Sequence, residues 1–103
     1  WSGNYPVAYW DSRWKSIWLD DDGIIAKLVN YGFDGIYLDW IEAYDDEKVA
    51  QYAQSKNISA KDEMITFIEE LKAKGKSINS KFVVIAQNAQ YLLDHNPTKY
   101  ASI

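Results

Sequence analysis

The stretch from Gly32 to Trp40, GFDGIYLDW, decides the fold class. It joins a glycine that ends a helix to a short apolar run, Gly35–Leu38, which is followed by an acidic residue, Asp39. The run does not alternate between apolar and polar side chains, which is typical of a strand covered on both faces. The stretch therefore predicts a buried strand of a parallel sheet that ends in a carboxylate.

Two similar apolar runs lie on either side of this stretch, Tyr5–Tyr9 (YPVAY) before it and Phe82–Ala86 (FVVIA) after it. Helical patterns separate and follow the strands: residues 12–18, a segment that starts at 20–22 and stops at Gly32, residues 44–54, a segment from Ser59 to Gly75, and residues 88–95. Alternation of strands and helices favours parallel strands joined by right-handed crossovers. The predicted fold class is therefore α/β.

The length of the chain bounds its architecture. A complete eight-unit barrel needs roughly 250 residues, whereas this chain has 103 and begins with Trp1 rather than Met. We therefore expect residues 1–103 to be a single incomplete segment of a (β/α)8 TIM barrel. Its open strand faces, at Val7, Tyr37 and Val84, should be exposed or covered by another copy, so self-association is expected. A small stand-alone α/β domain is the alternative.

Composition excludes several function classes. Hydrophobic residues make up 48% of the chain and the net charge is -4, so it is a folded protein without the clustered basic residues that a nucleic-acid partner requires. It has no cysteine and a single histidine, His95, which argues against disulfides, thiolate chemistry and His-based metal sites. No apolar run approaches the ~20 residues that a transmembrane segment needs. No metal and no cofactor is expected.

Polar residues follow each of the three predicted strands, at Asp11, Asp39 and Asn88. The carboxyl ends of parallel strands form one edge of a sheet, where the sites of β/α proteins lie. Two carboxylates on one edge suit glycoside hydrolysis, in which one is nucleophile or base and the other protonates the leaving oxygen. Three alternatives stay open: Asp11 as a helix cap, Asn88 as a turn residue, and the acidic residues as oxygen ligands of a metal ion, with Glu42 and Asp45.

Three stretches, YPVAYWDSRW, GFDGIYLDWIEAY and FVVIAQNAQYLL, together resemble the endo-α-1,4-polygalactosaminidase family of barrel glycoside hydrolases. Its bacterial and archaeal relatives were in part once described as cysteinyl-tRNA-synthetase-related. The resemblance implies that the chain covers about strands four to six of the barrel and that Asp39 is the catalytic carboxylate. The chain departs from the family where an acidic residue often follows the QN pair, because it has Ala89, Gln90 and Tyr91 there. The second carboxylate is therefore either lost or beyond Ile103.

The leading functional hypothesis is an endo-acting glycoside hydrolase on an α-1,4-linked galactosamine-type polysaccharide, secreted or at the cell surface. The segment by itself is expected to be inactive. The residues expected to contact substrate beside the catalytic Asp39 are Tyr9, Trp10, Asp11, Tyr37, Trp40, Glu42 and Asn88. One alternative is a non-catalytic carbohydrate-binding module, because all five tryptophans lie in the first 40 residues and indole rings stack on sugars. The other is a small α/β domain with no catalytic role.

Overall fold

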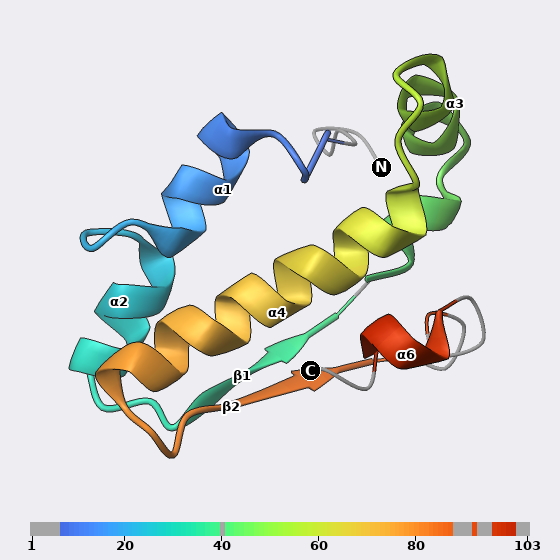
Figure 1. The fold of residues 1–103 in the computed structure, drawn as a ribbon. Coiled ribbons are helices and arrows are strands. Elements are labelled where there is room, and N and C mark those ends of the chain that lie inside the picture. The colour runs from blue at the N-terminus through green and yellow to red at the C-terminus, as the bar shows by residue number, and fades with distance from the viewer. Residues whose placement is uncertain (1–6, 40, 88–91, 93–95, 101–103) are drawn as a thin grey trace.

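The computed structural model describes residues 7–39, 41–87, 92 and 96–100 of the chain. Figure 1 shows the arrangement of its helices and strands. In chain order they are α1 (Ser12–Leu19), α2 (Ile24–Asn30), β1 (Gly35–Leu38), the 3-10 helix η1 (Ile41–Asp45), α3 (Glu47–Ser55), α4 (Ala60–Ile78), β2 (Val83–Ala86) and α6 (Pro97–Tyr100).

The two strands are adjacent and parallel. Gly35 is paired with Val83, and the register continues to Leu38 opposite Ala86. The segment between them contains η1, α3 and α4, so the chain forms one β-α-β unit. The predicted strand Gly35–Leu38 is confirmed, and the predicted strand Phe82–Ala86 is confirmed except for its first residue.

The predicted fold class, α/β with a segment of a (β/α)8 barrel, is wrong. In the described part of the chain, β1 and β2 are the only strands, and helices account for most of the structure. Of the predicted strand Tyr5–Tyr9, residues 5 and 6 lie outside the described residues. Val7 and Ala8 have no regular structure, and a turn follows in which the Asp11 N–H donates to the Ala8 carbonyl at 2.9 Å. Of the described residues 7–9, Tyr9 is buried in the core whereas Val7 is exposed. The apolar composition of these residues does not distinguish a turn from a strand.

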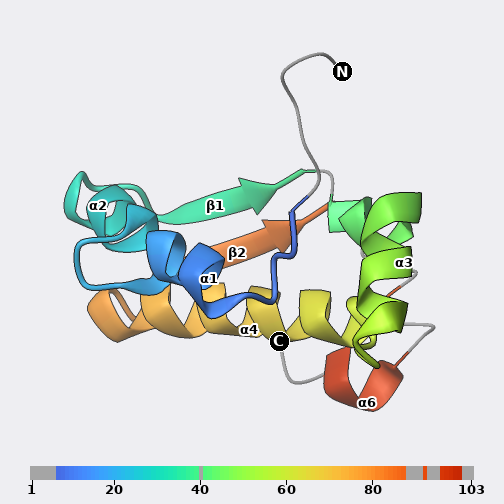
Figure 2. The same cartoon turned by 90° about the horizontal axis from the view of Figure 1, so that it is seen from above.

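Helix α4 is the main support of the sheet. Its N-cap is Ser59, whose hydroxyl accepts a hydrogen bond from the Asp62 N–H, and this satisfies one of the free donors at the helix start. Figures 1 and 2 show α4 running along both strands, in the direction opposite to theirs. The sequence predicted that this helix stops at Gly75. In the structure it continues to Ile78. Gly75 is a packing position, because a Cβ there would run into the ring of Phe82, which is fully buried.

Two clusters of buried side chains hold the helices together. One joins α1 and α2 to α4 around Ile25, Phe67 and Leu71. Two ion pairs border it, Lys15–Glu70 and Lys74–Asp21, each with an N–O distance of 2.6 Å. The other cluster lies at the carboxyl ends of the strands: Tyr9, Ile41, Tyr44, Val49, Met64, Ile65, Ile68 and Leu92, with Leu38 and Ala86 packed against them.

The two faces of the sheet differ in what covers them. Val84 and Ala86 pack against the core, whereas Tyr37, Val83 and Ile85 are 59%, 50% and 57% exposed. Tyr37 is opposite Ile85 in the register, so these side chains form one open apolar face. The exposure of Tyr37 agrees with the sequence prediction. The prediction for Val84 is wrong, because Val83 and Ile85 occupy the open face in its place.

None of the helices in the described ranges is long and apolar enough to cross a membrane.

Candidate functional site

Asp39 lies at the carboxyl edge of the parallel strand pair. It directly follows β1, and its side chain is exposed. The Gln87 N–H donates to the Leu38 carbonyl at 2.9 Å, which brings the residue after β2 to the same edge. In both Figure 1 and Figure 2 the arrowheads of the two strands point toward the end of the molecule where α3 stands. Ligand sites of parallel α/β folds occupy this edge.

Not every predicted site residue is described. Trp40 and Asn88 lie outside the described residues. Glu42 belongs to η1, and its side chain also lies outside the described part. Tyr37 is two residues before Asp39, so the two side chains share one face of the extended chain, and both are exposed. The described part of the edge thus brings together Tyr37, Asp39 and Gln87.

The sequence predicted that Tyr9 contacts the substrate. In the structure Tyr9 is a core residue instead. It is 3% exposed, and its hydroxyl donates to the Ala60 carbonyl at 2.6 Å. Burial raises the pKa of the Tyr9 hydroxyl well above its usual range, and the nearby Glu63 carboxylate adds to this shift. The side chain therefore ties the turn at residues 9–10 to the start of α4.

We expect Tyr9→Phe to lower the free energy of unfolding by about 1 kcal/mol, because one buried hydrogen bond is lost and the ring stays. Urea unfolding of the protein and its variant measures this difference. Sugar binding should not change, since the hydroxyl points into the core. Weaker sugar binding at unchanged stability would instead place Tyr9 in the site.

Asp11 is the N-cap of helix α1, which agrees with the interpretation of this residue as a helix cap. Its Oδ1 accepts from the Arg13 N–H at 2.8 Å, and its Oδ2 lies 2.9 Å from a guanidinium nitrogen of Arg13. Hydrogen bonds from the side chain and backbone of Arg13 lower the pKa of Asp11 to about 2. A carboxylate that is held so firmly in its ionised form is a poor proton donor at neutral pH.

The pKa of Asp11 predicts a pH-dependent contribution to stability. Because the pKa in the fold is below the ordinary value of 3.8, ionised Asp11 stabilises the fold above that pH, and the contribution is lost as the pH falls through about 2. Asp11→Asn keeps a capping oxygen but removes the charge. We expect the variant to be less stable than the parent in urea at pH 6, with the difference shrinking between pH 4 and pH 2. A difference that does not depend on pH would show that the charge of Asp11 contributes nothing.

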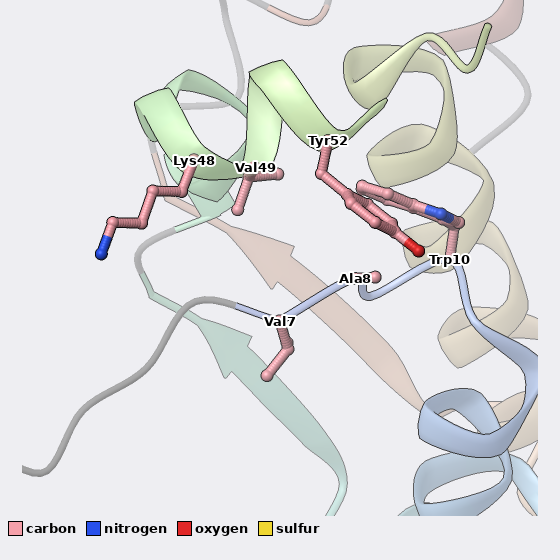
Figure 3. A pocket seen from close by; sticks show the side chains of 6 residues that line it. All are labelled: Val7, Ala8, Trp10, Lys48, Val49 and Tyr52. Atoms are coloured by element: carbon pink, nitrogen blue, oxygen red, sulfur yellow. The ribbon is translucent and has the colours of Figure 1, made fainter. Parts of the chain in front are cut away.

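A pocket of about 250 Å³ opens between α3 and the segment that precedes α1 (Figure 3). It is lined by Val7, Ala8, Trp10, Lys48, Val49 and Tyr52. The rings of Trp10 and Tyr52 are stacked, with centroids 6.1 Å apart and planes 21° apart. Val49 belongs to the core cluster against which Leu38 and Ala86, the last residues of the strands, also pack. The pocket is therefore close to the carboxyl edge of the sheet.

Trp10 was predicted as a site residue, but Tyr52 was not. Tyr52 lies in α3, 42 positions further along the chain, and nothing in its local pattern distinguishes it from other aromatic residues on a helix surface. Its ring is half exposed, and Lys56 Nζ lies 5.8 Å from the ring centroid. The stacking of Tyr52 on Trp10 depends on the fold, so no signal in the sequence singles it out.

Among the residues that the structure describes, no group of three or more His, Cys, Asp or Glu side chains is arranged to hold a metal ion. Asp11, which the sequence offered as a ligand, is bonded to Arg13. The described residues thus provide aromatic surfaces, Asp39 and Lys48 as candidates for contact with a ligand.

Three relatives match most of the chain. An uncharacterized protein of Deinococcus radiodurans is 37% identical over 90% of the chain and 27% of its own length. One of Thermotoga maritima is 33% identical over 99% of the chain and 30% of its own length, and one of Methanocaldococcus jannaschii is 36% identical over 93% and 26%. The chain spans less than a third of the length of these curated relatives. No protein-family model matches it. No solved structure gives a significant match either.

Proposed function

We propose that the full-length protein is an endo-acting glycoside hydrolase and that Asp39 is its catalytic carboxylate. The observation that supports the proposal is the exposed Asp39 at the carboxyl edge of a parallel strand pair. A rigid strand fixes the position of a residue that follows it better than a free loop does, and catalysis depends on that precision. The second carboxylate then belongs to a part of the full-length protein outside these 103 residues.

The proposed chemistry assigns one role to each described group. Asp39 attacks the anomeric carbon, or removes a proton from the water that does so, while the second carboxylic acid protonates the leaving oxygen. Tyr37 and the aromatic pair Trp10–Tyr52 offer flat surfaces for sugar rings. A galactosamine-type polysaccharide suits this edge, because its ammonium groups are attracted to a carboxylate.

The assay is the release of reducing ends from an α-1,4-linked galactosamine polymer by the full-length protein, which we expect to be active. The matched control is the N-acetylated polymer, which has the same linkage without the positive charges and should be cleaved more slowly. No release of reducing ends from either polymer, with the folded protein in excess, would contradict the proposal.

A carbohydrate-binding module without turnover is the second candidate. It is favoured by the position of Asp11, which is bonded to Arg13 and caps α1 and is thereby unsuited to be the acid beside Asp39. The stacked pair Trp10–Tyr52 would then carry the function. Binding of the polymer without release of reducing ends distinguishes this candidate from the hydrolase.

Location and assembly follow the same proposal. A polysaccharide hydrolase meets its polymer outside the cell, so we propose that the full-length protein is secreted or held at the cell surface. The open face of Tyr37, Val83 and Ile85 would support self-association of the 103-residue segment, because covering an exposed apolar patch lowers the free energy of the protein in water. The sedimentation of that segment at increasing concentration tests this.

A further inference from the structure

The turn that joins α3 to α4 (Figure 1) contains the tripeptide Asn57-Ile58-Ser59. An asparagine followed two positions later by serine or threonine, with any residue except proline between them, is the acceptor sequence of N-glycosylation. None of the other five asparagines in the 103 residues meets this requirement, and Asn96 fails because Pro97 follows it. A tripeptide of this kind also occurs by chance, so its place in the fold decides whether it is a credible site.

The end of α3 presents Asn57 at the surface of the molecule. The Asn57 N–H donates to the Gln54 carbonyl at 3.1 Å, and the Ile58 N–H donates to the Ala53 carbonyl at 2.9 Å. These two bonds close the helix end, and Asn57 adopts a left-handed backbone conformation there, with a φ of 57°. Asparagine is one of the few residues besides glycine that adopt this conformation readily. The backbone of Asn57 thus ends the helix, while its side chain remains available for another role.

The side chain of Asn57 is open to an incoming group. Asn57 is exposed, and within the described ranges its amide forms no hydrogen bond. It lines an open groove of about 690 Å³ together with small side chains such as Ala50 and Ala53, so a sugar has room beside the amide. Ser59 is exposed as well, but its hydroxyl caps α4. Because a glycosyltransferase has to recognise that hydroxyl, we place the modification before α4 is capped, while the exported chain is still unfolded.

We propose that Asn57 is an N-glycosylation site of the full-length protein. The second substrate is a glycan bound through its anomeric carbon to a lipid diphosphate. The Asn57 Nδ2 forms a bond to that carbon, the bond from the carbon to the diphosphate oxygen breaks, and the lipid diphosphate leaves with its electron pair, while Nδ2 loses one proton to the solvent. The inference rests on the proposed secretion, because this acceptor sequence is used in exported proteins. A bulky polar glycan is compatible with an exposed turn.

Mass spectrometry tests the proposal on the full-length protein, isolated from the culture medium and the cell envelope of the organism that produces it. We expect the peptide that contains Asn57 to be heavier than its sequence by the mass of a glycan. Exported protein with an unmodified Asn57 would overturn the inference and leave the secretion standing. Protein found inside the cell alone, with Asn57 unmodified, would overturn both. Hydrolysis of the galactosamine polymer is measured on the same preparation, so the hydrolase is judged separately.

Two substitutions of Ser59 separate the acceptor sequence from the helix cap. Threonine and aspartate both cap helices, so Ser59→Thr and Ser59→Asp both keep the start of α4 intact, but Ser59→Thr alone keeps the acceptor sequence. We expect the added mass to persist in Ser59→Thr and to be lost in Ser59→Asp. It should also be lost in Asn57→Asp, because aspartate tolerates the left-handed conformation and has no amide nitrogen. A glycan that persists in Ser59→Asp or in Asn57→Asp would contradict the site.

Discussion

Asp39→Asn in the full-length protein should lower turnover of the galactosamine polymer by roughly 10³-fold or more, because the side chain keeps its shape and loses its nucleophilic or basic charge. Binding of the polymer should change little. The interactions that are lost belong to the transition state, whereas contacts of the sugar with Tyr37 and the aromatic pair remain. Initial rates and binding isotherms, measured on the same preparations, separate the two effects.

Asp34→Asn is the matched control for this variant. Asp34 is an exposed residue of the same type that precedes β1, so it lies at the amino end of the strand that Asp39 follows. Its backbone carbonyl accepts from the Val83 N–H at 3.0 Å, and the substitution leaves that bond in place. Turnover should stay near the parent value. Equal losses in the two variants would show an effect of net charge, and full activity of Asp39→Asn would end its catalytic assignment.

Phe82→Ala should lower the free energy of unfolding by roughly 3–5 kcal/mol, because a fully buried aromatic ring is removed and the space cannot close completely. Phe82 precedes β2, and its ring packs on Gly75 of α4 where a helical side chain would otherwise be. The ring therefore joins the last turns of the helix to the start of the strand. Urea unfolding measures the loss.

Phe33→Ala serves as the control, because Phe33 precedes β1 and is 56% exposed. We expect its cost to stay within about 0.5 kcal/mol, as for most surface substitutions. A second variant tests the contact itself: Gly75→Ala should be destabilising in the parent and nearly neutral in the Phe82→Ala background. Additive costs would contradict the direct packing of Phe82 on Gly75.

Much of the strand pair and its edge could be predicted from the sequence. The run GIYL has a helix-ending glycine before it and an aspartate after it, and these local features fixed both the strand and the position of Asp39. The start of α4 was also readable, because Ser59 and Asp62 form a local capping arrangement. The sequence did not reveal which face of β2 is covered. All four residues of β2 are apolar, so the sequence has no alternation of apolar and polar side chains from which the covered face could be predicted.

The errors come from contacts between residues that are far apart in the chain. YPVAY is as apolar as a strand, but its last residue, Tyr9, lies in a turn, and the Tyr9 hydroxyl donates a hydrogen bond to the carbonyl of Ala60, 51 residues away. The Asp11 carboxylate caps α1 and accepts hydrogen bonds from Arg13. Asp11 is therefore no longer a candidate for the second carboxylate beside Asp39. The ring of Tyr52 reaches the pocket only because α3 folds back to residues 7–10. Because residues 7–10 form no strand, the described part of the chain has two strands and the basis for a barrel segment is lost.

Hydrogen exchange of the full-length Asp39→Asn protein, with and without a galactosamine oligomer, tests most directly whether the carboxyl edge of the strand pair is the carbohydrate site. This variant should hold the oligomer without cleaving it. We expect added protection of the backbone N–H groups of residues 37–39 and of Gln87, with no change at residues 31–34 at the opposite end of β1. Protection confined to residues 31–34, or none in the presence of saturating oligomer, would contradict a carbohydrate site at Asp39.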